Sequence, residues 1–300
     1  MKKKTYLFTL MAMALTLGSC SDNENGIGGE TSKYITVSTS IGNMTRVATD
    51  AKGGQTFEEG DEISVYAWIG APTVAPETRE RVVNNAINKL TNGSWISNPQ
   101  MLWKNNRDKH YFIGVYPTAA ISDLSAGEYT FDETKQVESD LLVAVNKDGL
   151  SYNVDEPQTV PLTFTHVMAK LAVNLTYKNQ WGGIPTVEKV VVGNAAKEAT
   201  INYLTKVVTP STTAKEDFSL PEITENTKYV SVIIPQEDVK QLTIVIGGKN
   251  FVYDNGTPFK LESGKITTVN LEVGRDEIKL GDVKITNWED GSTFSGEALN

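Results

Sequence analysis

Short apolar runs with a period of two recur along the chain, and this pattern constrains the fold more than any other feature. In residues 62–69 the aliphatic side chains fall on one face, whereas Tyr66 and Trp68 fall on the other. Nearly all of the runs are bounded by Gly, Pro, Asn or Asp, which favour turns. The other runs lie at 110–117, 140–145, 187–193, 228–235, 241–248, 250–254 and 265–273. Short alternating strands between turns predict an all-β sandwich architecture.

The segment 77–90 is open to two interpretations. Val82, Ala86 and Leu90 have the spacing of a helix face, but a period of two fits the same residues equally well. A short surface helix here would leave the all-β class unchanged.

The longest alternation runs from Thr165 to Tyr177 and predicts a single strand. Such a strand would extend roughly 40 Å, which is long for a globular protein. Just before it, the polar segment 151–161 contains Pro157 and Pro161, as is typical of a linker. We therefore predict a domain boundary in this segment, with β-sandwich domains at 34–158 and 159–300.

Residues 1–19 are typical of an export signal, because a basic start at Lys2–Lys4 precedes the apolar segment Tyr6–Leu17. That segment is too short to span a bilayer as a helix, which takes about 20 residues. The signal ends in Leu17-Gly18-Ser19-Cys20, which resembles the lipobox of bacterial lipoproteins. The resemblance implies that Cys20 is acylated and becomes the first residue of the mature protein. An ordinary signal peptide with an incidental cysteine is the alternative.

Residues 20–33 are polar and rich in glycine, so they predict a tether. The acidic stretch 21–25 resembles the export tag of surface lipoproteins, although such stretches also occur as solvated linkers. The whole chain has a net charge of −9, and the signal carries only positive charges. Because an acidic protein repels nucleic acid, we expect no nucleic-acid partner.

The first strand of the fold is predicted by the alternation of Ile35, Val37 and Ile41 with Ser and Thr. It is followed by a polar segment that contains Arg46 and Val47 and then by a Gly-rich stretch. A strand that ends beside an arginine in such a segment is either permanent or cut away after Arg46. Further candidate cleavage points are Arg79 and Arg81.

Groups suited to catalysis or to metal binding are sparse. His110 and His166 fall in different predicted domains, and the chain has one cysteine, no nucleophile motif and no phosphate-binding loop. We therefore predict that the protein is not an enzyme and has no cofactor or metal site. The aromatic residues are more typical of a sandwich core than of an exposed sugar-binding platform: Tyr66, Trp68, Trp95, Trp103 and Trp181.

Several segments resemble those of one protein family in content and order. After the lipobox and Thr45-Arg46 come FEEGDEISVYAW, DLLVA, FTHVMAKLAVNL, LESGKITTVNLEV and ITNWEDG, at 57–68, 140–144, 164–175, 261–273 and 285–291. Together they resemble the fimbrillin-like proteins, which are the subunits of type V pili. The resemblance implies two transthyretin-like β-sandwich domains in tandem.

The same resemblance implies how the protein matures. Family members are exported as outer-membrane lipoproteins, so the chain would be anchored through Cys20 until a trypsin-like, arginine-specific protease cuts between Arg46 and Val47. Cleavage would remove the first strand and leave a groove that a strand of the next subunit fills. The partners are then other fimbrial subunits, identical or related.

The segment 278–288 is our candidate for the donated strand. Its apolar residues are Ile278, Leu280, Val283, Ile285 and Trp288. Equally, this segment fits the last strand of the C-terminal sandwich. The function predicted is that of a structural subunit of a cell-surface fimbria that supports adhesion. The alternatives are an anchor or tip subunit, or a glycan-binding surface lipoprotein.

Overall fold

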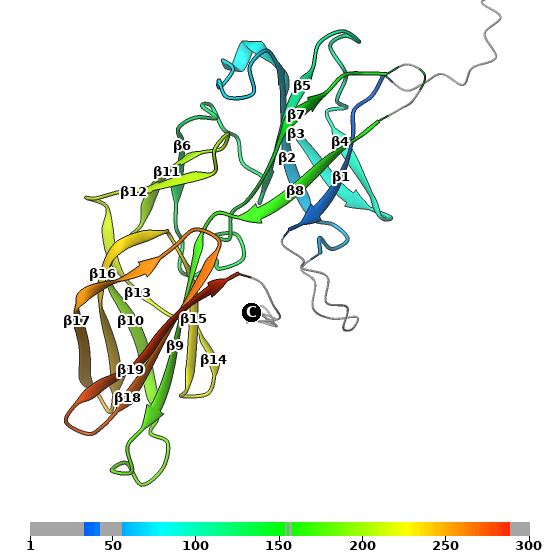
Figure 1. Cartoon of the computed structure of the whole chain (residues 1–300). Helices are drawn as coiled ribbons and strands as arrows, with labels where there is room; N and C mark the ends of the chain where they lie inside the picture. The colour runs from blue at the N-terminus through cyan, green and yellow to red at the C-terminus, as the bar shows by residue number, and fades with distance from the viewer. Residues whose placement is uncertain (1–32, 43–55, 154, 156–157, 289–300) are drawn as a thin grey trace, which may run out of the picture. The chain divides into compact units, whose positions relative to one another are not determined.

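The computed structural model describes residues 33–42, 56–153, 155 and 158–288 (Figure 1). The helix found in these residues is a single 3-10 turn, η1 (Thr78–Glu80). Strands arranged in four sheets make up the regular structure of the rest. The protein is therefore all-β, as the alternation predicts, whereas its division into two transthyretin-like sandwiches stays a prediction.

A seven-stranded sheet contains the N-terminal strands in the order β1-β8-β7-β5-β2-β3-β4. Its strands are β1 (Thr36–Ile41), β2 (Glu62–Ile69), β3 (Arg81–Thr91), β4 (Ser94–Asn98), β5 (His110–Tyr116), β7 (Leu142–Leu150) and β8 (Thr159–His166). Strand β1 pairs with β8 in parallel, and the other pairs are antiparallel. The ambiguous segment 77–90 thus forms η1 and most of β3, so its period-two interpretation is confirmed.

The seven-stranded sheet curls until its two edge strands, β1 and β4, come into contact. The indole Nε1 of Trp95 in β4 donates a hydrogen bond of 3.0 Å to Oγ1 of Thr39 in β1. Tyr34, just before β1, forms an antiparallel bridge with Leu102, which follows β4 in the chain. Closing a sheet on itself protects its edges and encloses one of its faces.

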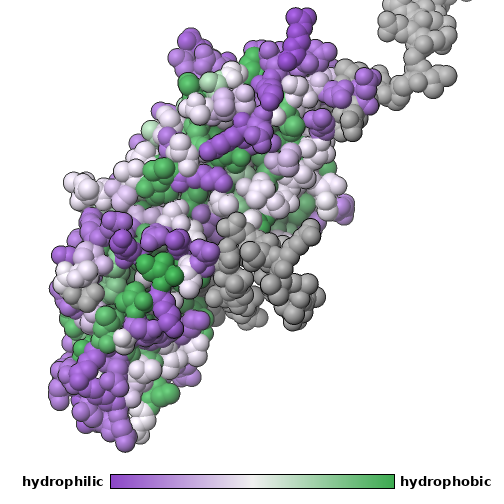
Figure 2. All heavy atoms as spheres, viewed as in Figure 1, coloured by the Kyte–Doolittle hydropathy of each residue, from purple (hydrophilic) through white to green (hydrophobic). Residues whose placement is uncertain are grey.

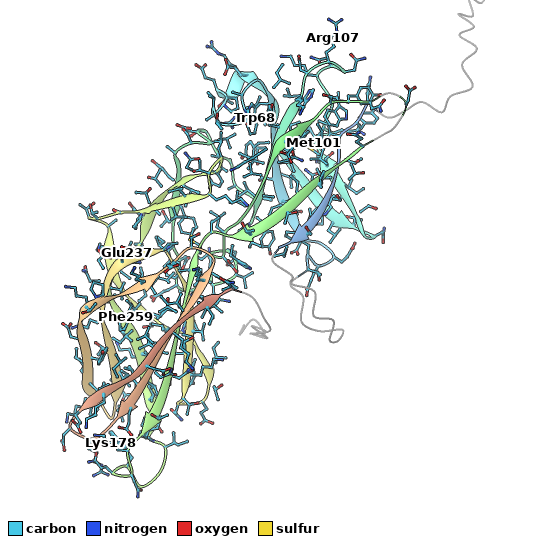
Figure 3. The ribbon with its side chains drawn as sticks, in the orientation of Figure 1. Trp68, Met101, Arg107, Lys178, Glu237 and Phe259 are labelled. Atoms are coloured by element: carbon cyan, nitrogen blue, oxygen red, sulfur yellow. The ribbon has the colours of Figure 1, made fainter. Side chains whose placement is uncertain are left out.

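The enclosed face forms a separate hydrophobic core. Its buried members are Ile35, Val37, Ile63, Val65, Ala67, Val83, Ala86, Met101, Trp103, Phe112, Leu142, Ala144, Val160, Leu162 and Phe164. Figure 3 labels Met101 within this sheet, and only 2% of its surface is exposed. Gly114 in β5 leaves room for the ring of Phe164, whose Cζ atom would lie 2.6 Å from a β-carbon at that position. This core includes Val37 of β1 and Ile35, which directly precedes β1 and continues its alternation.

The remaining strands form three further sheets. The five-stranded sheet contains β14 (Glu222–Thr224), β15 (Lys228–Ile233), β9 (Ala169–Tyr177), β18 (Lys265–Val273) and β19 (Ile278–Asn287). The four-stranded sheet contains β13 (Lys215–Ser219), β10 (Val187–Ala196), β16 (Gln236–Ile246) and β17 (Lys249–Leu261). The three-stranded sheet contains β12 (Val207–Pro210), β11 (Glu198–Asn202) and β6 (Gly127–Thr130).

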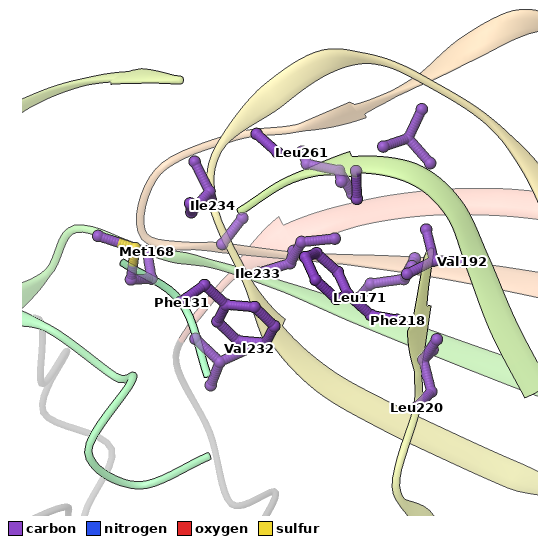
Figure 4. Close-up of a cluster of buried hydrophobic side chains, with 14 of the residues drawn as sticks. Phe131, Met168, Leu171, Val192, Phe218, Leu220, Val232, Ile233, Ile234 and Leu261 are labelled. Carbon is purple, nitrogen blue, oxygen red and sulfur yellow. The ribbon is translucent and has the colours of Figure 1, made fainter. Parts of the chain in front are cut away.

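Side chains from these sheets meet in a second, larger core (Figure 4). Leu171 of β9 and Val232 of β15 belong to the same buried cluster as Val192 of β10 and Phe218 of β13. The cluster also includes Tyr66 and other residues on the outer face of the seven-stranded sheet. On the visible surface, apolar groups are small and lie among polar ones (Figure 2).

The prediction of one long strand from Thr165 to Tyr177 is wrong. Strand β8 ends at His166 in the seven-stranded sheet, and β9 begins at Ala169 in the five-stranded sheet. The buried apolar side chains of β8 are Val160, Leu162 and Phe164, at even positions, whereas the predicted alternation follows odd positions and includes only Thr165 from the body of β8. The alternation therefore changes phase at the break, and its odd-numbered part belongs to β9. The predicted domain boundary between 158 and 159 stays a prediction; β8, which begins there, pairs with β1 and β7. The change of sheet lies at Val167-Met168.

Truncating Ile35, which directly precedes β1, should destabilise the protein even though β1 is a short edge strand. We expect Ile35→Ala to lower the free energy of unfolding by about 2–5 kcal/mol, as for other buried aliphatic side chains. The exposed neighbour Ser38 provides a control, and Ser38→Ala should change stability by less than about 0.5 kcal/mol. Urea denaturation followed by tryptophan fluorescence measures both values. Equal effects of the two substitutions would show that β1 does not hold the core.

Candidate functional site

The predicted first strand, β1, lies in a slot between β8 and the segment 101–103. On one side it pairs with β8 along its whole length, from Thr36 opposite Thr159 to Ile41 opposite Phe164. On the other side the Ile35 amide donates to the Met101 carbonyl at 2.9 Å. We call the space that β1 occupies, between β8, Trp95 and residues 101–103, the β1 slot. Main-chain hydrogen bonds hold the strand on both sides of the slot.

The inward and outward side chains of β1 have different surroundings. Ile35 and Val37 are 2% and 6% exposed, and Ile41 is half-buried. The outward hydroxyl groups of Thr36 and Ser40 lie 3.2 Å from those of Thr159 and Thr163 in β8. Strand β1 carries no charged side chain. The slot therefore holds its strand by apolar burial and main-chain bonding, which many sequences can supply.

Thr39 is the polar exception on the inward side of β1. It accepts the hydrogen bond from the indole of Trp95, and the Trp95 ring packs edge-on against Phe57 at 5.3 Å. Phe57 also lies 5.1 Å from the ring of Phe164. Aromatic neighbours thus hold Trp95 with its N–H directed at the strand.

The predicted donor segment forms β19, an edge strand that pairs with β18. A β-bulge sets Gly281 and Asp282 opposite the single residue Asn270, so Leu280 and Val283 both face the same side as Leu271 and Val269. Ile278 and Ile285 share this face by register. Ile278, Leu280, Val283 and Ile285 of the predicted set therefore form one face of β19, and Trp288 directly follows the strand. Their role as a donor stays a prediction.

The apolar side chains of β19 are less deeply buried than those at the start of β1. Val283 and Ile285 of β19 are 38% and 39% exposed, although Val269 opposite Val283 is fully buried. Strand β19 thus has a complete hydrogen-bonded ladder but a poorly buried face. This combination is the opposite of what a core strand needs.

Trp288, the last described residue, is held at the junction of β8 and β9. Its ring stacks on His166 with the centroids 4.2 Å apart, and the ammonium group of Lys170 lies 4.2 Å from the Trp288 centroid. The Nδ1 atom of His166 lies 2.8 Å from Oδ1 of Asp140. We call Asp140, His166, Lys170 and Trp288 the C-terminal clasp.

Burial sets the electrostatics of the clasp. It lowers the pKa of the Lys170 ammonium group to about 8, an effect that the carboxylate of Asp140 partly offsets. The indole N–H of Trp288 is buried and has no hydrogen-bond partner in the described part of the chain. An unpaired buried donor weakens the hold of the clasp. Trp288 therefore ties down the end of β19 by ring contacts and by its amide, which donates to the Gly264 carbonyl at 3.0 Å.

The structure describes only some of the residues predicted to take part in maturation. Cys20, Arg46 and Val47 lie outside the described residues. Of the other candidate cleavage points, Arg81 is buried and its guanidinium donates to the carbonyls of Ile121 and Ser122. Arg79 is exposed and lies in η1. A protease can thus reach Arg79 far more easily than Arg81.

The other histidine, His110, has a structural role. The His110 ring is buried, and its Nε2 accepts a hydrogen bond from the Lys104 amide, while burial lowers the imidazole pKa. In residues 33–42, 56–153, 155 and 158–288, no cluster of three or more acidic, His or Cys side chains is arranged to hold a metal ion. The same part of the chain has no helix of the length and hydropathy that a membrane crossing requires.

The aromatic side chains form core and not a platform. Tyr66, Trp68 and Trp103 are buried, and Trp95 and Trp181 are half-buried. The core interpretation of these residues is confirmed. The sequence gives one signal for the contact of Trp95 with Thr39, which is the polar residue at an inward position of the first strand. It gives no signal for the clasp around Trp288.

Solved structures with a similar fold include proteins from Bacteroides species. A proposed cell adhesion protein from Bacteroides ovatus is 18% identical, with a TM-score of 0.65, and the alignment covers 85% of this chain and 98% of that one. One from Bacteroides uniformis is 16% identical, with a TM-score of 0.63 and the same coverage. A fimbrial protein from Bacteroides vulgatus is 12% identical, with a TM-score of 0.50 and coverage of 75% and 92%. At these identities the similarity is evidence for the fold alone.

A family model gives the stronger evidence. No curated protein matches the chain at a significant level. The model described as fimbrillin-like matches residues 45–288, from just before Arg46 to Trp288, which directly follows β19. Because this match covers most of the sequence, the chain belongs to the fimbrillin-like family.

Proposed function

We propose that this protein is a structural subunit of a cell-surface fimbria and that subunits join by exchange of a strand. The observation that carries the proposal is β1, a six-residue edge strand whose buried Val37 completes a core together with Ile35, which directly precedes it. Its chain continues into the segment that contains Arg46. One cut there would separate β1 from the remainder of the fold.

The export and anchoring steps of the proposal come from the sequence. The lipobox supports acylation of Cys20 and attachment to the outer membrane before maturation. A trypsin-like, arginine-specific protease would then cut between Arg46 and Val47 and release the subunit for assembly. In the fimbria the partners would be other copies of this chain or related subunits, and the protein would contribute to adhesion as a structural component and not as an enzyme.

Loss of β1 would create a strong acceptor for a new strand. The main-chain groups of β8 and of residues 101–103 that now bond to β1 would lose their partners. The positions of Ile35 and Val37 would open to water, and burial of two such side chains contributes about 1.5–3 kcal/mol each. A strand from another subunit would restore both sets of interactions.

Strand β19 is the donor that we propose. Its inward side chains Val283 and Ile285 would move from a half-exposed edge to a nearly buried slot. Since the ladder with β18 is exchanged for a ladder with β8, the gain in apolar burial would drive the transfer.

Cleavage after Arg46 should be required for assembly. Treatment of the purified precursor with a trypsin-like protease should yield a chain that begins at Val47 and forms multimers. Arg46→Ala should leave the precursor monomeric, whereas Arg79→Ala, which alters an exposed arginine in η1, should assemble normally. Mass spectrometry and size-exclusion chromatography measure the two outcomes. A trimmed protein that begins at Val47 and stays monomeric would contradict the polymerising role.

An anchor subunit is the second candidate, and the same proteins separate it from a polymerising subunit. An anchor would retain β1 and the lipid. Acylated Cys20 on chains recovered from assembled fimbriae would assign the anchor role.

A charge on the inward face of β19 should block assembly but spare the monomer. We expect Ile285→Lys to lower the free energy of unfolding of the precursor by less than about 1 kcal/mol, because the side chain is already 39% exposed. In a subunit interface the same lysine would be buried without a partner, so multimers should not form after proteolysis. Val252→Lys in β17, where Val252 is 51% exposed, is the matched control and should assemble. Equal assembly of both variants would exclude β19 as the donor.

Opening the C-terminal clasp should speed assembly. Trp288→Ala removes the ring that contacts His166 and Lys170, so the end of β19 should leave β18 more readily. We expect faster multimer formation by light scattering after proteolysis. Ile223→Ala, at the opposite edge of the same sheet, should leave the rate unchanged. A rate for Trp288→Ala equal to that of the unmodified protein would show that the clasp does not restrain β19.

A further inference from the structure

We propose that residues 283–287 of a second copy fill the β1 slot in one register, and that Trp95 selects this register. The inference rests on the proposed function, because it specifies the alignment of the strand that replaces β1. The positions of Ile35, Val37 and Thr39 are taken by Val283, Ile285 and Asn287, respectively.

The N–H group of Trp95 requires a hydrogen-bond acceptor on the strand that occupies an otherwise apolar slot. Its indole N–H donates to Thr39 at 3.0 Å, and Phe57 packs against its ring. Phe57 in turn contacts Tyr116 and Phe164, which belong to β5 and β8. These neighbours remain when β1 leaves, so the N–H stays directed into the slot. A partly buried donor that loses its acceptor raises the free energy of the complex, so a replacement strand with an acceptor at the position of Thr39 is favoured.

A strand that fits the slot therefore has an apolar residue at one position, a second apolar residue two positions later and a hydrogen-bond acceptor two positions after that. In β19 the set Val283, Ile285 and Asn287 has this order, and the amide oxygen of Asn287 is a neutral acceptor. Its two apolar members are β-branched, as are Ile35 and Val37, so their shapes suit the same pleated surface.

Other alignments of β19 satisfy the slot less well. A shift by two residues in one direction sets Gly281 at the position of Ile35 and Ile285 against the Trp95 N–H. The opposite shift sets Asn287 at the apolar position of Val37. A register that starts at Ile278 places the charged side chain of Asp282 at the Thr39 position, where β1 and its neighbour β8 offer no cation.

The direction of the strand follows from β1, which runs parallel to β8. The incoming β19 segment must run the same way to present Val283, Ile285 and Asn287 in the order in which Ile35, Val37 and Thr39 meet the slot. In the proposed register the Val283 amide donates to the Met101 carbonyl, as the Ile35 amide does now. The Gly281 carbonyl takes the place of the Lys33 carbonyl, which accepts from the Trp103 amide at 3.2 Å.

Disulfide cross-linking between copies tests the register. The hydroxyl groups of Thr36 and Thr159 lie 3.2 Å apart, so a side chain at the Thr36 position reaches residue 159. In the proposed register that position belongs to Lys284. The trimmed chain has no cysteine of its own, because the only one is Cys20. We expect the double variant Thr159→Cys and Lys284→Cys to form cross-linked multimers under oxidising conditions after proteolysis.

Two further double variants report the competing registers. Thr159→Cys combined with Asp282→Cys tests the two-residue shift, and combined with Lys279→Cys it tests the register that starts at Ile278. Cross-links in either variant without cross-links at residue 284 would overturn the proposed register while leaving strand exchange in place. Absence of multimers from the unmodified trimmed protein would overturn the proposed function and this inference with it.

A cycle of substitutions tests the role of Trp95 as the selecting residue. Asn287→Leu should slow assembly about tenfold in the unmodified background, as expected for one unsatisfied buried donor. In the Trp95→Phe background, which keeps an aromatic ring but has no N–H, the same change should have little effect. Thr286→Ala, at the neighbouring outward position, is the control. If Asn287→Leu slows assembly equally in both backgrounds, Trp95 does not select the register through a hydrogen bond to Asn287.

Discussion

The pairing of β1 with β8 is the interaction on which the N-terminal half of the structure depends. Without β1 the curled sheet would have six strands and a gap between its edges, and β1 fills that gap by pairing with β8 on one side while the Ile35 amide bonds to Met101 on the other. Ile35 and Val37 then close the core that the sheet encloses. Because one short strand completes both a hydrogen-bonded ladder and an apolar core, its exchange for an equivalent strand would change little in the rest of the fold.

In strand β19 the main chain is hydrogen-bonded to β18, but the apolar side chains are poorly buried. It has a full ladder with β18, yet Val283 and Ile285 are more than a third exposed. Its end depends on Trp288, a ring packed between His166 and Lys170 whose own N–H is unpaired among the described residues. A strand whose main chain is satisfied but whose apolar face is not is stable enough for a monomer and has free energy to gain in a better-buried position.

The sequence predicted the elements better than their connections. Alternation located the strands around residues 63, 113, 190, 230 and 270, because a period of two follows directly from the geometry of an extended chain. It failed at residues 165–177, where β8 and β9 belong to different sheets and the buried apolar positions shift from even numbers, up to Phe164, to odd numbers, from Val167. Periodicity records which side of a strand is buried and carries no information about which strand lies beside it.

The sequence by itself determined that the chain is all-β, that Ile35 and Val37 form one face of a first strand, and that Ile278, Leu280, Val283 and Ile285 form one face of a last strand. These conclusions need only local geometry. Only the tertiary structure decided that β1 lies parallel to β8 opposite Trp95, that Gly281 forms the bulge that keeps the β19 face continuous, and that Trp288 is held beside His166. Each of these contacts joins residues far apart in the chain, and their positions follow from the curl of the sheet and the packing of the cores.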